Sequence, residues 1–270
     1  MRIGVISDLH YDLNENYGET DFYYTLHEIV TEQQIDLLVI GGDISNSYET
    51  STRFVERLQT VIDRPVKFIP GNHDYWEKDS DVKDSAAVYR RYTNHPQCLM
   101  ERPLILNDHY ALVGHSAWYN HSVHDPRFSE EEVELGVYGE RTWQDKLNTN
   151  WGMTDRELSR KFAEIVRKDL EAVGEREVIL VTHMVTVPEF TVKMPHPQFD
   201  YFNAFIATDD FDSLHQEFPI KHSCMGHVHY RHSFERDGIS YSCNCLGYER
   251  EWRSEDFKKE LEASLYTVDI

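Results

Sequence analysis

Long apolar runs are missing from this sequence of 270 residues. The apolar stretch near its start, in MRIGVISDLH, is interrupted by Asp8 and lacks the small-residue cleavage site that a secretory signal needs. No later segment stays apolar over the roughly 20 residues that a membrane-spanning helix requires. We therefore expect a cytoplasmic protein with no membrane contact.

Positive charge is scarce as well. The chain has 27 Lys and Arg against 48 Asp and Glu, which gives a formal charge of -21 with histidines neutral. A surface this acidic repels the phosphate backbone of nucleic acids and anionic lipids, and no stripe rich in Lys and Arg offsets it. Nucleic acid is therefore a disfavoured partner. A small phosphorylated substrate remains compatible, because bound metal ions can reverse the charge locally.

Cysteine is rare, at four residues: Cys98, Cys224, Cys243 and Cys245. This usage predicts reduced thiols in a cytoplasmic protein. The alternative is a metal or redox role for Cys243 and Cys245, but their C-x-C spacing has no second half elsewhere in the chain.

The pattern of apolar segments along the sequence predicts one α/β domain over residues 1–270. Short β-branched strands alternate with amphipathic helices in the N-terminal part, which is the pattern of a parallel sheet with crossover helices. A helix is expected to begin at Thr154, which has capping-box spacing to Glu157, and to stop at Gly174. The other expected elements are strands at 2–7, 37–40, 66–69, 111–114 and 178–181, helices at 22–31 and 54–62, and antiparallel strands at 239–243 and 265–268.

Two stretches do not fit a layered core. Residues 118–151 are polar and aromatic, and residues 188–211 are rich in proline and aromatics. We expect both to be ordered, lid-like insertions over a face of the sheet. Packing explains the insertion aromatics Trp118 and Tyr119 more readily than stacking on a substrate does.

Possible metal ligands follow the ends of five expected strands. In an open α/β sheet, ligands bind outside the carboxyl ends of the strands, so these side chains should converge on one site. The mixture of carboxylate, amide and imidazole groups suits first-row metals such as manganese, iron, zinc, cobalt or nickel. The residues at these strand ends are Asp8, His10, Asp43, Asn72, His73, Asp74, His183, His227 and His229.

Five segments around these residues resemble the motifs of the calcineurin-like metallophosphoesterase superfamily, in the family's order. The resemblance implies a hydrolase of phosphoester bonds and a layered α-β-β-α sandwich of two mixed sheets with flanking helices. One motif alone would be weak evidence, whereas five in order, each after an expected strand, are a strong signal. The segments are D-L-H at 8–10, G-G-D at 41–43, G-N-H-D at 71–74, T-H at 182–183 and G-H-V-H at 226–229.

The resemblance also implies a centre of two divalent metal ions, which could be Mn, Fe, Zn or Ni. Two such ions can clamp a phosphoryl group and activate a hydroxide as the nucleophile. By the resemblance, Asp8, His10 and His229 would hold one ion, Asn72, His183 and His227 the other, and Asp43 would bridge them.

A catalytic pair is implied beside the metals. His73 would protonate the leaving oxygen as a general acid, and Asp74 would orient His73. Asn72 and Arg231 are candidate contacts for the substrate, although Arg231 is equally explained by a salt bridge at the surface. Taken singly, His183 is more readily explained as a buried core histidine. Structural explanations of this kind would require five coincidences.

The residues within and after two of the motifs narrow the range of possible substrates. Gly42-Asp43 is followed by Ile-Ser-Asn-Ser, without the arginine of the protein serine/threonine phosphatases, and His10 stands where purple acid phosphatases have an aspartate. We therefore expect a small phosphodiester such as a nucleotide, with a phosphomonoester of the nucleotidase type as the alternative. The acidic charge counts against a nuclease. A catalytically silent scaffold is disfavoured, because every ligand position and His73 are filled.

Overall fold

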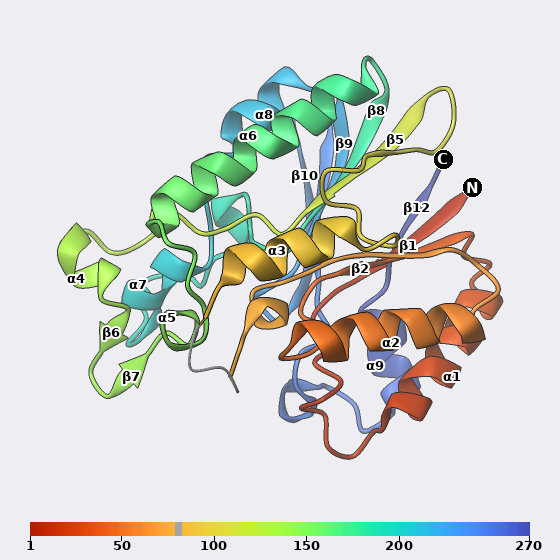
Figure 1. The fold of residues 1–270 in the computed structure, drawn as a ribbon, viewed down its shortest axis with the longest axis horizontal. Helices are drawn as coiled ribbons and strands as arrows, with labels where there is room; N and C mark the ends of the chain where they lie inside the picture. The colour runs from red at the N-terminus through yellow and green to blue at the C-terminus, as the bar shows by residue number, and fades with distance from the viewer. Residues whose placement is uncertain (79–82) are drawn as a thin grey trace.

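A computed structural model describes residues 1–78 and 83–270 of the chain. Two mixed sheets lie face to face with helices on their outer sides, so the expected layered α-β-β-α architecture is confirmed (Figure 1). The two termini lie side by side, and the amino group of Met1 donates a hydrogen bond to the carbonyl of Ile270 at 2.7 Å.

The N-terminal sheet contains the first three expected strands and one strand from the C-terminus. They are β1 (Arg2–Ile6), β2 (Leu37–Gly41), β3 (Val66–Ile69) and β12 (Tyr266–Asp269). The first three pair in parallel, and β12 pairs antiparallel with β1. Every residue of β2 is buried, because helices cover one face of this sheet and the second sheet covers the other.

The helices on the outer face of the N-terminal sheet are α1 (Glu19–Glu32), α2 (Tyr48–Val61) and α9 (Phe257–Ala263) (Figure 1). Helix α2 begins six residues before the expected start at 54. Its N-cap is Ser47, whose side chain accepts a hydrogen bond from the backbone N–H of Thr50 at 3.3 Å. This cap explains the earlier start, since it satisfies one of the free N–H groups at the helix end.

The C-terminal sheet has six strands in the order β10-β11-β9-β8-β5-β4. They are β4 (Leu104–Ile105), β5 (Tyr110–His115), β8 (Glu177–Thr182), β9 (Ile220–Met225), β10 (Arg231–Arg236) and β11 (Ile239–Asn244). The expected antiparallel strand at 239–243 corresponds to β11. That strand pairs antiparallel only with β10 and runs parallel to β9, the strand expected before His227 but without predicted bounds.

Helices α6 (Asp155–Val173) and α8 (Asp212–Glu217) cover the outer face of the C-terminal sheet (Figure 1). The predicted start and end of α6 are confirmed. The capping box joins Thr154 and Glu157, and Gly174 ends the helix with a φ of 69°. A further helix, α3 (Ser85–Asn94), and two short 3-10 turns, η1 (His73–Tyr75) and η4 (Glu249–Glu251), lie in connecting segments.

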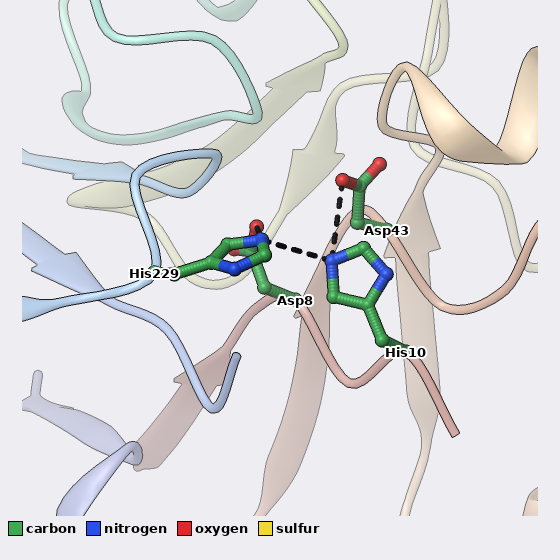
Figure 2. A group of neighbouring side chains, drawn as sticks. All are labelled: Asp8, His10, Asp43 and His229. Atoms are coloured by element: carbon green, nitrogen blue, oxygen red, sulfur yellow. Dashed lines mark hydrogen bonds and ion pairs between the residues drawn. The ribbon is translucent and has the colours of Figure 1, made fainter. Parts of the chain in front are cut away.

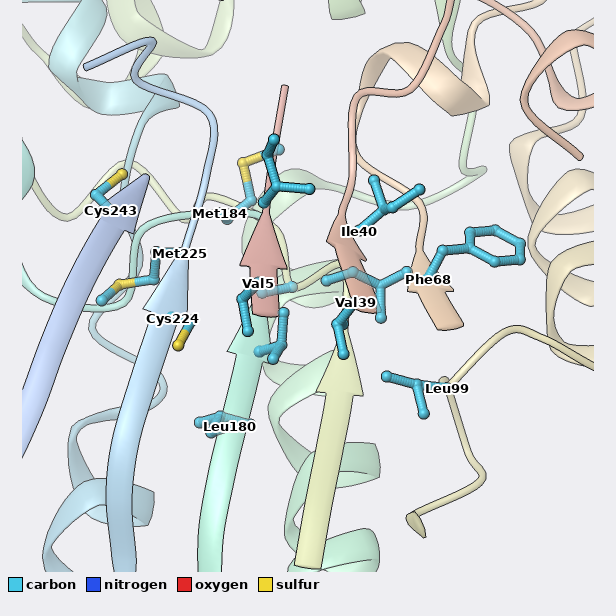
Figure 3. Packing of buried hydrophobic residues seen from close by; sticks show 14 of the residues in the cluster. Val5, Val39, Ile40, Phe68, Leu99, Leu180, Met184, Cys224, Met225 and Cys243 are labelled. Atoms are coloured by element: carbon cyan, nitrogen blue, oxygen red, sulfur yellow. The ribbon is translucent and has the colours of Figure 1, made fainter. Parts of the chain in front are cut away.

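One continuous hydrophobic core joins the two sheets. Val5 and Val39 of the N-terminal sheet belong to the same buried cluster as Leu180 and Cys224 of the C-terminal sheet (Figure 3). This shared core fixes the two sheets relative to each other, and therefore also fixes the loops at their ends.

The two expected insertions are ordered and pack against each other. Tyr201 donates to the carbonyl of Glu132 at 2.7 Å, and Arg141 donates to Gln198 at 2.8 Å. They follow β5 and β8 in the chain and lie beyond the carboxyl ends of these strands (Figure 1). Their elements are α4 (Glu130–Glu134), β6 (Val137–Tyr138), β7 (Arg141–Thr142) and α5 (Asp145–Asn148), then η2 (Pro188–Phe190), α7 (Phe199–Phe202) and η3 (Asn203–Phe205).

Candidate metal centre

The loops that follow β1, β2, β3, β8 and β9 meet at one end of the two sheets. Their backbone is unusual, because several residues other than glycine have a positive φ. Such conformations are uncommon and persist where the surrounding structure imposes them, often at functional sites. Among the predicted ligands they are Asp8 (φ 58°), His10 (φ 40°), Asp43 (φ 52°), His227 (φ 75°) and His229 (φ 54°).

Close approach between these loops requires glycine at two motif positions. A Cβ atom on Gly71 would overlap the carboxylate of Asp43, and one on Gly226 would overlap the Ser7 hydroxyl and the Asp8 carboxylate. Only glycine lets the backbone pass so close to these side chains. Steric crowding therefore explains why the G-N-H-D and G-H-V-H motifs have glycine at positions 71 and 226.

Four predicted ligands form the first ligand group, defined as Asp8, His10, Asp43 and His229 (Figure 2). One ligand atom from each residue lies within 4.8 Å of those of the others. The Nε2 atom of His10 is 3.0 Å from Nε2 of His229 and 3.5 Å from Oδ2 of Asp43. The Nε2 atom of His229 is 3.4 Å from Oδ1 of Asp8.

The second ligand group consists of Asp43, Asn72, His183 and His227. The Oδ1 atom of Asn72 lies 3.0 Å from both Nε2 of His183 and Nδ1 of His227, and Nε2 of His183 is 3.3 Å from Oδ1 of Asp43. Asp43 belongs to both groups. The structure thus brings all seven predicted ligands together, with Asp43 between the two sets.

Outer hydrogen bonds fix the tautomers of three of the histidines. Nδ1 of His183 lies 2.9 Å from the carbonyl of Gly41, Nε2 of His227 lies 3.0 Å from the carbonyl of Phe205, and Nδ1 of His229 lies 2.9 Å from Glu251. Since these oxygens only accept, each outer nitrogen carries the ring proton, and the other nitrogen of a neutral ring turns a lone pair toward the centre.

This arrangement fits metal ions. Lone pairs and carboxylates that converge repel one another unless a cation lies among them, and outer partners of this kind are typical of metal-ligating histidines. In addition, Nδ1 of His10 is buried without a hydrogen-bond partner in the described residues. The donor set of oxygen and nitrogen atoms suits first-row divalent ions.

Asp43 is the electrostatic focus of the centre. Burial opposes its ionised form, but His183 and His73 hold its pKa well below the ordinary value. Burial likewise opposes a charge on His183, and the Asp43 carboxylate outweighs it and raises the pKa of that ring to about 10. Burial lowers the pKa of His227 to about 3. Without a metal, His183 therefore carries a proton opposite the ionised Asp43 carboxylate, and a bound metal cation would displace that proton.

His73 lies beside the two groups and is partly open to solvent, with its side chain 13% exposed. Its backbone N–H donates to Oδ1 of Asp43 at 2.9 Å. Its ring stacks on Trp76 with 3.6 Å between the ring centroids. Its Nδ1 atom lies 2.8 Å from Oδ1 of Asn46, so Nε2 is the nitrogen left for a ligand.

The expectation that Asp74 orients His73 is wrong in this structure. The carboxylate of Asp74 accepts hydrogen bonds from the backbone N–H groups of Ile44, Ser45 and Gly71 and from the hydroxyl of Ser51. Asp74 therefore ties the loop after β2 to the loop after β3. Asn46 takes the orienting position, three residues after Asp43, where the sequence shows only an asparagine between two serines.

Arg231 does not join the site. Its guanidinium forms an ion pair with Glu260 at 2.6 Å and donates to the carbonyl of Cys245 at 3.1 Å. The expected contact with a phosphate is therefore not supported, because the carboxylate of Glu260 already neutralises the charge of Arg231. The salt bridge that the sequence left open is what the structure shows, although both side chains are largely buried.

A cavity of about 500 Å³ opens onto the centre. Asp43, Asn72, His73, His227 and His229 lie on its inner side. Aromatic side chains from both insertions form much of the rest, namely Trp143, Phe199 and Phe202, together with Trp76.

Two segments border this cavity; the first lies in the expected lid-like insertion at 118–151, and neither was predicted to contact a metal ligand. The insertion wall is residues 141–145, and the C-terminal wall is residues 248–251. The insertion wall contains the buried Asp145, which accepts from Asn72, and the C-terminal wall contains Glu251, which lies against His229. Their loops carry no motif, and a lone carboxylate among many in an acidic chain gives no usable signal.

Other residues singled out from the sequence lie apart from the centre. Trp118 and Tyr119 are fully buried, in agreement with packing. All four cysteines are free and buried. Cys243 and Cys245 approach to 3.8 Å between their sulfur atoms, and no cysteine belongs to a metal-like group within residues 1–78 and 83–270. Among the helices of the described residues, none is both long and apolar enough to span a bilayer.

Comparison with known proteins agrees with this geometry. A family model described as calcineurin-like phosphoesterase matches residues 1–231. The solved structure of a phosphopantetheinyl hydrolase from Mycobacterium tuberculosis is similar over 98% of this chain and 95% of its own, with a TM-score of 0.75 and 19% identity. No relative was found among curated protein sequences.

Two further solved structures share the fold at lower similarity. A protein of Thermus thermophilus has a TM-score of 0.54 and 12% identity, over 99% of this chain and 98% of its own. A dimetal phosphatase from Danio rerio has a TM-score of 0.52 and 14% identity, over 90% of this chain and 86% of its own. At such identities the likeness shows the fold alone.

Proposed function

Because the chain belongs to the calcineurin-like phosphoesterase family, we propose that it hydrolyses a small phosphodiester at a centre of two divalent metal ions. Asp8, His10 and His229 would hold one ion, Asn72, His183 and His227 the other, and Asp43 would bridge them. The observation that carries this proposal is the pair of ligand groups that share Asp43, with one nitrogen of each imidazole facing inward and, in His183, His227 and His229, the other held by an outer acceptor.

The ions, when bound, would act as Lewis acids on the phosphoryl group and lower the pKa of water to near neutrality. The chain's own contribution is to hold the substrate and to move a proton. His73 faces the cavity and its Nδ1 is engaged by Asn46, so Nε2 is the atom that would donate to the leaving oxygen.

His73 needs the substrate to become an acid. Burial lowers its pKa to about 4 in the free protein. An anionic phosphoester placed beside Nε2 favours the protonated ring, because an opposite charge within about 4–6 Å stabilises it. Substrate binding would thus raise the pKa of His73 and favour the protonated form that gives up its proton.

The cavity supports a small organic phosphate. Trp143, Phe199 and Phe202 offer flat apolar surfaces that suit a nucleoside or another body of similar size. Arg141 and Arg250 border the same cavity, and their contacts within residues 1–78 and 83–270 are with an amide and a ring, not with a carboxylate. In a chain of charge -21, cations whose charge no carboxylate neutralises favour an anionic ligand, although Arg141 also donates to Gln198 and Arg250 lies over the ring of Tyr248.

The test compares bis-p-nitrophenyl phosphate with p-nitrophenyl phosphate. Protein stripped of metal is resupplied with manganese, zinc, nickel or iron, and nitrophenolate release is followed. We expect activity to return with metal and to favour the diester. A panel of nucleotides and a phosphopantetheinyl ester, which the Mycobacterium tuberculosis neighbour's name suggests, then narrows the natural substrate.

Each result has a distinct meaning. Metal-restored activity that favours the monoester would keep the centre and make a nucleotidase-like phosphatase the better proposal. The absence of activity with every metal on both substrates, from a folded protein that binds no metal, would refute the proposal.

A further inference from the structure

Asp145 connects the insertion to the candidate metal centre. It begins α5 and its side chain is 1% exposed. Each of its two carboxylate oxygens accepts two hydrogen bonds. The donors are Asn72 Nδ2 at 2.9 Å and Trp76 Nε1 at 2.7 Å on Oδ1, and Trp143 Nε1 at 2.9 Å and Tyr119 OH at 3.2 Å on Oδ2.

The first consequence concerns Asn72. An ionised carboxylate only accepts, so Asn72 must present its NH₂ group to Asp145. Its carbonyl oxygen then faces the opposite way, where it lies 3.0 Å from ring nitrogens of His183 and His227. A flipped amide would set two oxygens against each other. Asp145 therefore determines which atom of Asn72 faces the second ligand group.

The second consequence concerns His73. The indole N–H of Trp76 is fixed by Asp145, and the ring of Trp76 stacks on the imidazole of His73 with an interplanar angle of 27°. Asn46 holds the same imidazole through Nδ1. The orientation of His73 thus depends on Asp145 through one intermediate ring.

We propose that Asp145 is a positioning residue that sets the carbonyl of Asn72 toward the second metal site and, through Trp76, aligns His73. This inference rests on the proposed function, because it takes Asn72 as a metal ligand. It gives residues 118–151 a role beyond covering the cavity, since one carboxylate of this insertion joins a ligand, the proposed acid and the cavity wall at Trp143.

The matched control is Asp155, which lies ten residues further on. It is also a nearly buried carboxylate with several partners: the indole of Trp118 donates to it at 2.8 Å, the ammonium of Lys146 donates at 2.5 Å, and Nε2 of His121 lies 3.2 Å away. None of these partners is a predicted ligand. Asp155→Asn therefore perturbs the same region with the same chemical change and leaves Asn72 untouched.

The experiment measures metal stoichiometry and affinity, which a purely structural role would not change. Wild type, Asp145→Asn and Asp155→Asn are dialysed against limiting Mn²⁺, and bound metal is determined by mass spectrometry and calorimetric titration. Loss of an outer partner of a metal ligand typically weakens metal binding about 10–100-fold. We expect D145N to keep one ion and lose the other, with rescue by excess Mn²⁺, and D155N to keep both.

Two milder substitutions, one for each carboxylate, test the same inference if D145N does not fold. Trp143→Phe removes one donor from Asp145, and Trp118→Phe removes one from Asp155. We expect W143F to weaken one metal site several-fold and W118F to leave both sites at wild-type affinity.

Two results would overturn the inference: equal metal loss in both members of either pair, or full retention of both ions by D145N. A wild type that binds no metal would instead refute the proposed function, so the two failures can be told apart.

Discussion

The two walls of the cavity come from distant parts of the chain but are built from the same kinds of residue. Each supplies a carboxylate that contacts a predicted ligand, an aromatic ring and an arginine. These are Asp145, Trp143 and Arg141 in the insertion wall, and Glu251, Tyr248 and Arg250 in the C-terminal wall.

The carboxylates differ in their surroundings. Asp145 is buried and receives four hydrogen bonds, whereas the side chain of Glu251 is 36% exposed and accepts from His229 and from the backbone of Tyr248. A hydrogen bond shielded from water is electrostatically stronger than one at the surface. The second ligand group is therefore held more firmly than the first, and we expect it to bind its ion more tightly and to fill first.

The largest effect is expected at Asp43, which belongs to both ligand groups and therefore to neither wall alone. Asp43→Asn removes the only negative charge common to them, so we expect both ions to be weakened and activity to fall by more than the roughly 100-fold that loss of an outer partner can cause. Metal content and diester hydrolysis measure this, with Asp155→Asn as the control. Retention of both ions with full activity would contradict the bridging role.

His73 tests whether proton transfer separates from metal binding. His73→Ala removes no ligand, so metal content should stay at two ions while turnover falls about 10²–10⁴-fold, the usual contribution of general acid catalysis. The loss should be least for esters with good leaving groups such as nitrophenolate. An equal loss across a series of leaving groups would argue against the acid role.

Glu251 tests the C-terminal wall directly. Glu251→Gln replaces one oxygen by an NH₂ group, and this weakens the hold on Nδ1 of His229. We expect about a tenfold loss of affinity at one metal site, less than for Asp145→Asn because Glu251 is exposed. Calorimetric metal titration of both variants measures the difference.

Glu249→Gln is the control for this experiment, since Glu249 lies in the same turn and contacts Asn16 instead of a ligand. An effect of E251Q greater than that of D145N would reverse the order of the two walls.

The ligands could be predicted because the sequence shows where the buried strands end. Short apolar strands followed by Asp8, Asp43 or His183 predict convergence at one sheet edge, and the structure places these side chains together. The start and end of α6 followed from its cap residues in the same way.

The supporting residues could not be predicted, because they lie in segments without periodicity. Asn46, Asp145 and Glu251 each sit in a turn or short helix whose path depends on tertiary contacts. The error on Asp74 has the same origin. Its position next to His73 in sequence suggested a contact, but the backbone of η1 turns its carboxylate toward the N–H groups of Ile44 and Ser45.

The smallest effect is expected for the two arginines, one from each wall. Arg141 and Arg250 are exposed, so water and salt screen their attraction for an anionic substrate, and each charge should contribute no more than about 1 kcal/mol. Alanine at either position should raise KM about two- to fivefold with little change in kcat, and the difference should shrink in 1 M salt. Arg253→Ala, an exposed cation that does not line the cavity, is the control. If R253A raised KM as much, overall charge would explain the effect. If only one of the two cavity arginines mattered, the substrate would lie against that wall, and the walls would differ in substrate binding as they do in metal support.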